Sequence, residues 1–527
     1  MKLKFVISLV IAGTALTAHS QGKPMNPITQ AMMDVYEQQL NENPKDYDVY
    51  FRRASEYYNH DQYLRALSDV ENAIKYTPAS NKDMLYKEYS LRGNIYSMTG
   101  RHEEALADFK KALQLDPKSF VTIYEMANEE YELGDLVSAK ADYKKLQRMN
   151  PRNTEAIVGL TRIAIKEGNM DQAKVLMNQI VDLNPAAPGS YIRRAGIKRE
   201  IGDNTGAVED LVMAISIEGN SRAVKELVSL ANEDYTAAYN GLSSAIRTAP
   251  NVALFYYLRA TIAMAHFHYT TALQDFKTII EQNLYNFPGL YDSMAQCYLA
   301  LGKYPEALKE CNFAIGWADD KEPYYVTLSK IRRAMNDTTL ALEAAEKAVA
   351  LAPDNNEAKV QKALCLVSEK NYKDAAEILG EVNLNDDNNP YNFMLRAWIL
   401  NDYLSQLSAA GALYKRVLEM DYPENVVTSF RGFAYLYTDY KSAGNEWIED
   451  ILSKPDNDGQ LNYYGACYYA YAGDKDKAFE CMKKSLAKGY ANLYDWTLNN
   501  DARINVAPLR EDDRFKALLK EYDYLFQ

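Results

Sequence analysis

The sequence has few of the residues that build metal centres and disulfide scaffolds, with five cysteines and five histidines in 527 residues. An odd number of cysteines, the first of them Cys297, excludes a small disulfide-built fold. The interval from Cys297 to Cys311 is the same as that from Cys467 to Cys481. This shared spacing fits a disulfide across each of two helical hairpins, and it also fits two pairs of small buried thiols.

Long hydrophobic runs and an excess of positive charge are also missing. A membrane-spanning helix needs about 18 or more consecutive apolar residues. The longest candidate after residue 21, at 254–267, is interrupted by Arg259 and His266. The formal net charge of -13 repels phosphate backbones. We therefore expect no membrane span and no nucleic-acid partner.

The one targeting signal lies at the N-terminus. Lys2 and Lys4 precede an apolar run over 5–18, and the small residues Ala18 and Ser20 stand three positions and one position before Gln21. This order is typical of a secretory signal peptide with a cleavage site. The sequence predicts a signal peptide at 1–20 and an exported protein, periplasmic or otherwise in the cell envelope, with an extracellular location left open.

What the sequence does have is a repeat built on alanine. Most of the intervals between successive alanines of this series have nearly the same length. A second, mostly bulky residue follows each alanine by four positions, which places both on one helical face. The alanines are Ala66, Ala105, Ala139, Ala173, Ala207, Ala238, Ala272, Ala307, Ala341, Ala375, Ala410, Ala443 and Ala478. The residues four positions on are Val70, Phe109, Tyr143, Met177, Leu211, Leu242, Phe276, Cys311, Ala345, Leu379, Tyr414, Trp447 and Met482.

Other small residues and turn residues mark the rest of the unit. A small residue lies 12 positions before many of these alanines, as Ala54 and Gly93 do, so two helices are expected to cross closely there. Glycines that recur with the same period are expected to end the first helix in a left-handed conformation, at Gly100, Gly134, Gly168 and Gly202. Prolines such as Pro117 and Pro151 follow the second helix. Each unit is therefore predicted to be a helix, a short turn and a second helix.

One stretch of the repeat resembles a known family. The stretch Tyr89-Ser-Leu-Arg-Gly-Asn-Ile-Tyr-Ser-Met-Thr-Gly-Arg-His-Glu-Glu-Ala-Leu-Ala-Asp-Phe-Lys-Lys-Ala-Leu-Gln-Leu-Asp-Pro117 closely resembles the consensus of the tetratricopeptide repeat. The resemblance implies an all-α fold, a right-handed superhelical solenoid of about thirteen helix-turn-helix repeats. It also implies that the first helix of each repeat lines a concave groove, and that the protein binds a partner.

The predicted organisation has four parts. The signal peptide at 1–20 is followed by an N-terminal capping helix within 21–46, with Ala31, Val35 and Tyr36 expected to face inward. The repeat array occupies 47–487, and a C-terminal capping segment, in which a Pro-Leu-Arg turn leads into an acidic helix start, occupies 488–527. The sixth repeat is shorter than the others, so a bend or weak joint is expected at 219–234, where limited proteolysis is expected to cut first.

Candidate binding residues follow from the family resemblance, which assigns the first helix of each repeat to the groove. Two of them, Asn94 and Asn128, are one repeat apart, so their amides are expected to stack and to bind the backbone of an extended peptide. The aromatic residues would supply contact area at low entropic cost. The complete set is Phe51, Tyr58, Asn94, Tyr124, Asn128, Tyr131, Tyr257, Trp398, Phe433 and Tyr463. Some of these aromatic residues are alternatively expected to pack between repeats.

Three classes of function remain. A scaffold that binds a protein or extended peptide in the envelope fits best, and a glycan-binding protein that stacks sugars on groove aromatics is the alternative. An enzyme is not expected, because the sequence has no phosphate-binding glycine loop, nucleophile elbow or zinc-binding His-Glu-x-x-His motif. His266 and His268, with one residue between them, would diverge on one helix, so neither a metal site nor a cofactor is predicted. The sequence does not indicate the partner or the oligomeric state.

Overall fold

The computed structural model describes residues 27–219, 221–420, 430–438 and 440–527. Within these residues the regular secondary structure is entirely helical, without strands. They form 29 α-helices and three short 3-10 helices. The predicted all-α class is therefore confirmed. The predicted signal peptide and residues 21–26 lie outside the described residues.

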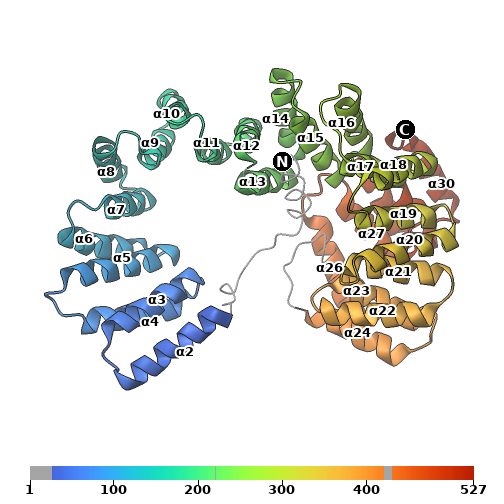
Figure 1. Cartoon of the computed structure of the whole chain (residues 1–527), viewed down its shortest axis with the longest axis horizontal. Helices are drawn as coiled ribbons and strands as arrows, with labels where there is room; N and C mark the ends of the chain where they lie inside the picture. Colours follow the sequence, from blue (N-terminus) through green and yellow to red (C-terminus); the bar gives the residue numbers. More distant parts are fainter. Residues whose placement is uncertain (1–26, 220, 421–429, 439) are drawn as a thin grey trace. The chain divides into compact units, whose positions relative to one another are not determined.

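Twenty-six of these helices follow one another as thirteen consecutive pairs, as the repeat period predicts (Figure 1). The pairs are α3 (Tyr47–Asn59) with α4 (Tyr63–Tyr76), α5 (Lys82–Met98) with α6 (His102–Leu115), α7 (Phe120–Glu132) with α8 (Leu136–Met149), α9 (Thr154–Lys166) with α10 (Met170–Asp182), α11 (Pro188–Glu200) with α12 (Asn204–Glu218), α13 (Ser221–Glu233) with α14 (Tyr235–Thr248), α15 (Ala253–Ala265) with α16 (Tyr269–Glu281), α17 (Pro288–Ala300) with α18 (Tyr304–Trp317), α19 (Glu322–Ala334) with α20 (Thr338–Leu351), α21 (Asn356–Ser368) with α22 (Tyr372–Asn385), α23 (Pro390–Asp402) with α24 (Leu407–Glu419), α25 (Arg431–Tyr435) with α26 (Lys441–Ser453), and α27 (Gln460–Ala472) with α28 (Lys475–Ala487). The others are α2 (Pro27–Glu42), α29 (Leu493–Thr497), η1 (Asp501–Arg503), η2 (Ala507–Leu509), α30 (Asp513–Glu521) and η3 (Asp523–Leu525).

The turns inside the pairs have the backbone conformation that the glycines predict. The four glycines named above have φ between +72° and +82°, in the left-handed region. The same position in other pairs holds residues with a side chain, including Phe267 with φ +63° and Lys370 with φ +62°. Left-handed conformation is costly for such residues, so these turns carry local strain.

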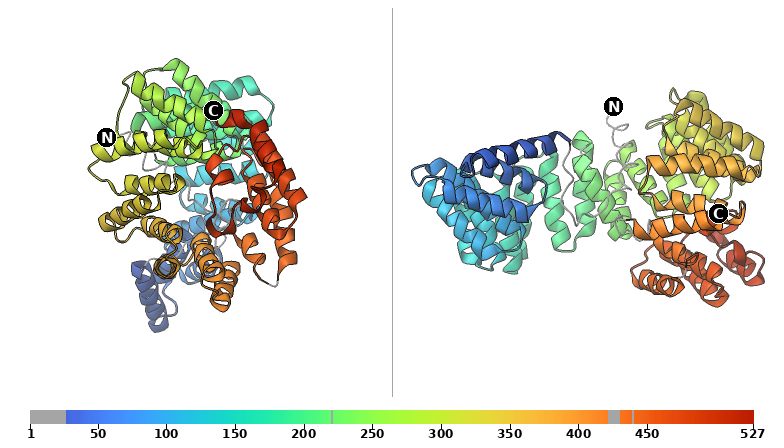
Figure 2. Two further views of the ribbon diagram at one scale, coloured as in Figure 1. Left: turned by 90° about the vertical axis from the view of Figure 1, so that its right-hand side faces the viewer. Right: turned by 90° about the horizontal axis from the view of Figure 1, so that it is seen from below.

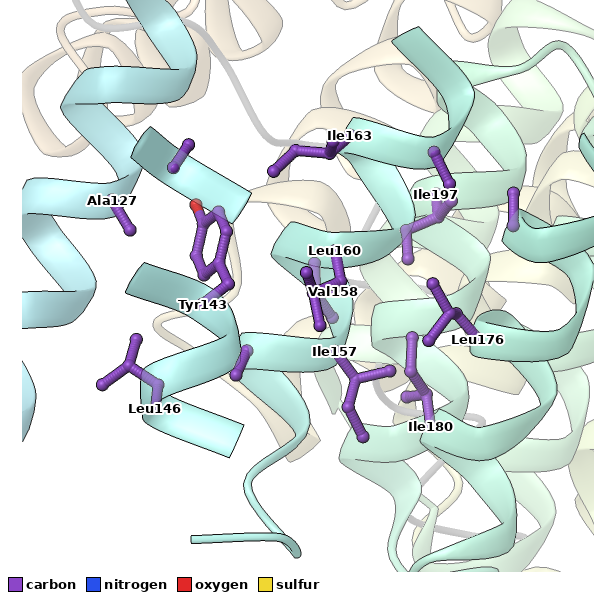
Figure 3. Packing of buried hydrophobic residues seen from close by; sticks show 14 of the residues in the cluster. Ala127, Tyr143, Leu146, Ile157, Val158, Leu160, Ile163, Leu176, Ile180 and Ile197 are labelled. Atoms are coloured by element: carbon purple, nitrogen blue, oxygen red, sulfur yellow. The ribbon is translucent and has the colours of Figure 1, made fainter. Parts of the chain in front are cut away.

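The core of twelve of the thirteen pairs lies where the alanine series predicts. Ala139 and Tyr143 are buried in one large hydrophobic cluster that extends from the third pair to Ile197 of the fifth (Figure 3). The Tyr143 ring packs directly on Gly159 of the next pair, where an added Cβ would lie 2.3 Å from Cζ of the ring. A small residue facing a large one therefore lets adjacent pairs pack without a gap.

The twelfth pair departs from the predicted register by one residue. Ala443 and Trp447 are only half-buried, whereas Gly444 and Ile448 are buried. Gly444 lies midway in the sequence between Ala410 and Ala478, so the buried position keeps the period on both sides. The predicted packing role of Ala443 is wrong, because the adjacent Gly444 occupies the buried position.

The helix α2 precedes the first pair, and its inward residues also differ from the prediction. Ala31 and Val35 are exposed, whereas Met33 and Leu40 are buried and Tyr36 is half-buried between them along the helix. These three inward residues are spaced by three and four positions, so they form one helical stripe against α3.

The described residues divide into two compact units between Ala223 and Val224. We call residues 27–223 the N-terminal unit and residues 224–527 the C-terminal unit. The division lies within the segment 219–234, where the shortened sixth repeat predicts a joint. Figure 2 shows the stacked pairs of each unit from two further directions.

The end of the chain packs back on the beginning of the C-terminal unit. His266 Nδ1 lies 3.1 Å from Asp458 Oδ2, and the rings of Phe267 and Tyr490 are 4.3 Å apart between centroids. Lys303 donates to the backbone carbonyl of Gln527, the last residue, at 2.8 Å. The C-terminal segment is thus part of the packed structure of this unit.

The five cysteines are free thiols, and all are buried. Cys297 and Cys311 are both 0% exposed, and Cys467 and Cys481 are also within the core. Burial raises the pKa of all four of these thiols. Of the two explanations for the equal spacing of the two cysteine pairs, the structure agrees with small residues at packing positions.

Candidate functional site

The contacts between pairs identify the inner face of each unit. First helices of neighbouring pairs touch each other, as α3 and α5, α7 and α9, and α9 and α11 do in the N-terminal unit. In the C-terminal unit α17 touches α19, and α19 touches α21. Helices that approach each other across a repeat lie on the inner side of a curved stack. The first helices therefore form the inner face.

In the N-terminal unit the predicted binding residues remain partly accessible. Phe51 and Tyr58 lie on α3, Asn94 on α5, and the other three on α7; all six are half-buried. The α7 residues are Tyr124, Asn128 and Tyr131. No feature of the structure tests whether they bind a ligand, so their binding role stays a prediction.

The electrostatics show that side chains from separate pairs face one another here. Burial raises the pKa of Tyr58, and the Glu125 carboxylate of α7 raises it further from two pairs away. Burial likewise raises the pKa of Tyr124, with a further contribution from Glu155 on α9. These couplings place residues of α3, α7 and α9 along one surface.

Asn128 is held by its own surroundings rather than by Asn94. The Tyr143 hydroxyl donates to its Oδ1 at 2.6 Å, and its Nδ2 donates to Glu125 Oε2 at 3.3 Å. Both hydrogen-bonding groups of the amide are therefore occupied within the protein. Asn128 therefore offers no free amide for the predicted stacking with Asn94. Asn94 itself is half-buried on the first helix of its own pair.

Ion pairs connect the next two first helices on this face. Arg162 of α9 pairs with Glu200 of α11, and Arg193 of α11 pairs with Glu155 of α9 at 2.5 Å. The Lys166 ammonium lies 3.7 Å from the centroid of the Tyr131 ring. Exposed pairs of this kind contribute about 0–1 kcal/mol each, so a ligand can replace them at small cost.

In the C-terminal unit the predicted binding residues are in the core. Tyr257 is 2% exposed, Trp398 4%, Phe433 1% and Tyr463 3%. Tyr257 packs against Phe287, with 5.6 Å between ring centroids. The prediction that these four residues offer a binding surface is wrong, because they fill space between repeats and under the C-terminal segment.

That segment covers the inner face of the C-terminal unit. Tyr463 is stacked on Tyr490, with 4.7 Å between ring centroids, and Trp496 meets it edge-on at 5.0 Å. Arg333 of α19 donates to both carboxylate oxygens of Asp501, at 3.0 and 2.8 Å. The sequence showed the capping segment but not its position, because these partners are 168 residues apart.

A second arrangement, which sequence reasoning missed, is a repeated buried ion pair. An arginine on the first helix forms two hydrogen bonds with an aspartate 16 residues later on the second helix. The arginine immediately precedes the small residue of the repeat, and the aspartate follows the series alanine by three positions, so the signal was present in the sequence. The pairs are Arg53–Asp69, Arg92–Asp108, Arg194–Asp210 and Arg259–Asp275.

Within the described residues no group of three or more histidines, cysteines and carboxylates is arranged to hold a metal ion. His266 is 6% exposed and faces Asp458, and His268 stacks on Tyr235 with 4.5 Å between ring centroids. Both histidines have a place in the packing of the C-terminal unit. Among the helices described, none has the length and apolar character to cross a membrane.

Comparisons with known proteins agree with the repeat. A tetratricopeptide repeat model matches residues 86–119, and a second model of the same repeat matches 130–191 and 332–399. The search of curated proteins gave no match.

Similar solved structures include a tetratricopeptide repeat protein from Parabacteroides merdae, 18% identical over 54% of this chain and 98% of that one, with a TM-score of 0.28. Yeast Tom70 is 16% identical over 78% of this chain and 98% of its own, with a TM-score of 0.36. YrrB, described as a TPR protein with an unusual peptide-binding site, is 20% identical over 37% and 97%, with a TM-score of 0.27. At TM-scores below 0.5 these likenesses carry no weight here. The repeat models matched over 86–119, 130–191 and 332–399, together with the consecutive helix pairs, support a tetratricopeptide repeat protein.

Proposed function

We propose that this protein is an exported scaffold that binds an extended segment of a partner protein on the inner face of its N-terminal unit. Tetratricopeptide repeat proteins generally mediate protein interactions, and their fold is typically non-catalytic. The proposal rests on one contrast. The predicted residues of the N-terminal unit keep exposed area, whereas the corresponding residues of the C-terminal unit are buried.

The accessible surface has the chemistry that an extended peptide needs. Tyr58, Tyr124 and Tyr131 offer large, stiff rings with a hydroxyl, which give contact area at small entropic cost. Asn94 carries both a donor and an acceptor for a peptide bond. The neighbouring ion pairs on α9 and α11 are weak enough to be exchanged for charges of the partner.

The test uses affinity purification after crosslinking in cells, with a tagged protein and two variants. The first variant is Tyr58→Ala, Asn94→Ala and Tyr131→Ala together, which leaves the hydrogen bond from Tyr143 to Asn128 in place. The control is Leu64→Ala on the second helix α4, where the side chain is 83% exposed. We expect a reproducible partner with the wild type and the control, and at least tenfold less of it with the first variant.

Circular dichroism must show the first variant to be folded. A folded first variant that retains its partner at the wild-type level would place the interaction elsewhere and refute the proposed site. Export is tested separately by the mass of the mature protein from the envelope fraction. A product that begins at Gln21 agrees with export, and a full-length product confined to the cytoplasm contradicts it.

A further inference from the structure

A cavity lies between the C-terminal segment and the inner helices of the C-terminal unit. Its volume is about 470 Å³, within the range of small-molecule sites. The helices α19, α21 and α23 form one side, and Tyr494, Asn499 and Asp501 of the C-terminal segment form the other. This cavity belongs to neither the N-terminal unit nor the binding surface proposed above.

The wall made by the C-terminal segment is held in a strained conformation. Ala502 and Arg503 are consecutive residues with side chains in the left-handed region, with φ +52° and +57°. Two bidentate ion pairs flank this strain, from Arg333 to Asp501 and from Arg503 to Asp402. Strain of about 1–3 kcal/mol per residue persists only where the surroundings enforce it, and it is concentrated at functional sites.

The charges that line the cavity are largely paired with each other. Lys330 Nζ lies 2.8 Å from Glu357 Oε1. Arg333 binds Asp501 and the Tyr494 hydroxyl through its two terminal nitrogens, whereas its Nε is buried without a hydrogen-bond partner among the described residues. Asp386 adds a further carboxylate to the wall. An anionic ligand would meet this carboxylate, while both cations among the described lining residues already hold carboxylates. The lining thus has three carboxylates, Glu357, Asp386 and Asp501, against two cations, a balance that disfavours phosphates and carboxylates.

The rest of the lining combines carboxamides with the apolar side chains of Leu299, Val360 and Leu364. Gln361 and Asn392 line the cavity and are 3% and 5% exposed, and the half-buried carboxamides of Asn356, Asn389 and Asn499 line it too. The amides of Gln361 and Asn499 already bond to Ser329 and to Asp495 and Asp501, so Asn356, Asn389 and Asn392 remain for a ligand. The Asn356 Oδ1 atom is buried and has no hydrogen-bond partner among the described residues. A buried polar atom without a partner costs about 1–3 kcal/mol, which a suitable ligand recovers.

The rings of Tyr391 and Tyr494 complete the lining. Carboxamides both donate and accept, a carboxylate accepts, and a tyrosine ring packs against C–H groups. A sugar ring presents hydroxyls that donate and accept, and it has an apolar face of C–H groups. We propose that this cavity binds a neutral saccharide of one or two rings.

An extended peptide is the competing ligand, and the shape of the site argues against it. A peptide in the groove of this family needs a continuous open face, whereas the C-terminal segment covers the inner face of this unit next to the cavity. The glycan alternative drawn from the sequence relied on exposed groove aromatics such as Trp398, which is buried. The present site relies instead on carboxamides and on two other tyrosines.

The experiment is isothermal titration calorimetry on the full-length mature protein. The probes are glucose, galactose and N-acetylglucosamine, their β1,4-linked and α1,4-linked disaccharides, galacturonate, and trialanine. We expect at least one neutral sugar to bind with a Kd below about 10 mM. Galacturonate is expected to bind at least tenfold more weakly than galactose if galactose is the ligand.

Three variants locate the binding. Asn392→Leu keeps the side-chain volume and removes the amide, and Asn389→Ala changes a half-buried position of the same wall in case the first variant is unfolded. Each is expected to weaken binding at least tenfold, whereas Asn94→Leu in the N-terminal unit leaves it unchanged. Absence of binding by every neutral sugar, binding of trialanine alone, or unchanged affinity in the folded cavity variants would overturn the proposal. None of these results bears on the partner-binding surface of the N-terminal unit.

Discussion

The pair formed by Arg259 and Asp275 gives the sharpest test of how a repeat is held together. Arg259 Nε and Nη2 donate to the two Asp275 oxygens at 2.8 and 2.6 Å, and Nη1 donates to Ser243 Oγ at 2.7 Å. The Asp275 side chain is 3% exposed and the Arg259 side chain 15%. Burial raises the pKa of Asp275, and the guanidinium opposes that rise. We consider the substitution Arg259→Met.

The loss of stability depends on whether Asp275 stays ionised after Arg259 is removed. Breaking a buried ion pair from one side costs about 3–5 kcal/mol, because the remaining charge is uncompensated. Asp275 can avoid that state by taking up a proton. With an ordinary pKa near 3.9 in the unfolded chain, protonation at pH 7 costs about 4 kcal/mol, and at pH 5 about 1.5 kcal/mol. The loss in the free energy of unfolding is therefore expected to be about 3–4 kcal/mol at pH 7 and about 1.5 kcal/mol at pH 5.

The assay exploits the distribution of tryptophan. All four tryptophans, at positions 317, 398, 447 and 496, belong to the C-terminal unit, so their fluorescence during urea unfolding reports on that unit. The control is Arg247→Met, an exposed arginine of α14. The double variant Arg259→Met with Asp275→Leu removes both charges and is expected to recover most of the loss. Equal destabilisation at pH 5 and pH 7, or no recovery in the double variant, would refute the reasoning.

Three further outcomes are expected. Burial raises the pKa of Glu88 to about 7, although the hydrogen bond from Thr77 opposes that rise, so the protonated form contributes stability that is complete below pH 4.5 and is lost as the pH rises through 7. Glu88→Gln should therefore flatten the pH dependence of the free energy of unfolding, measured by urea unfolding with circular dichroism. An unchanged pH dependence would contradict this. Lys370→Gly removes a side chain from an exposed turn residue in the left-handed region and should stabilise the C-terminal unit by about 0.5–1 kcal/mol in the fluorescence assay. A lower free energy of unfolding in this variant would contradict the idea that the turn is strained. Gly444→Ala places a Cβ 2.6 Å from the Tyr468 hydroxyl and should lower the free energy of unfolding by about 1–3 kcal/mol. Ala443→Gly, the matched control, should lower it by less. A larger loss for Ala443→Gly would support the register predicted from the alanine series.

The repeat was predictable because its signals are local. A left-handed glycine and a small residue 12 positions before an alanine act within one hairpin, so Gly100 and Ala105 mark their turn and their crossing in the sequence itself. The failure at Ala443 has the same origin. Two adjacent small residues, Ala443 and Gly444, satisfy the pattern equally, and only the packing of Tyr468 on the glycine distinguishes them.

The candidate site was less predictable because burial depends on distant parts of the chain. The first helices of both units carry tyrosines in similar positions, so the sequence assigns Tyr58 and Tyr463 the same role. Their burial differs in the structure, since Tyr463 packs beneath Trp496 of the C-terminal segment, whereas Tyr58 is half-buried. Contacts such as Arg333 with Asp501, which span 168 residues, leave no periodic signal. The Arg–Asp pairs within single repeats did leave one, and it could have been found by following the alanine series on both helices.

The two inner faces therefore present different energetic conditions to a partner. A partner segment that binds the inner face of the C-terminal unit must first displace Asp501 from Arg333 and Arg503 from Asp402. Each separation exposes charged groups that water or the partner must then pair with. On the N-terminal unit, the half-buried tyrosines and exposed ion pairs require only desolvation and the exchange of contacts worth about 0–1 kcal/mol each. Even with identical gross contact energy, binding to the N-terminal unit is then favoured by several kcal/mol. A long partner should bind there, while the covered face of the C-terminal unit is left with a site the size of a small molecule.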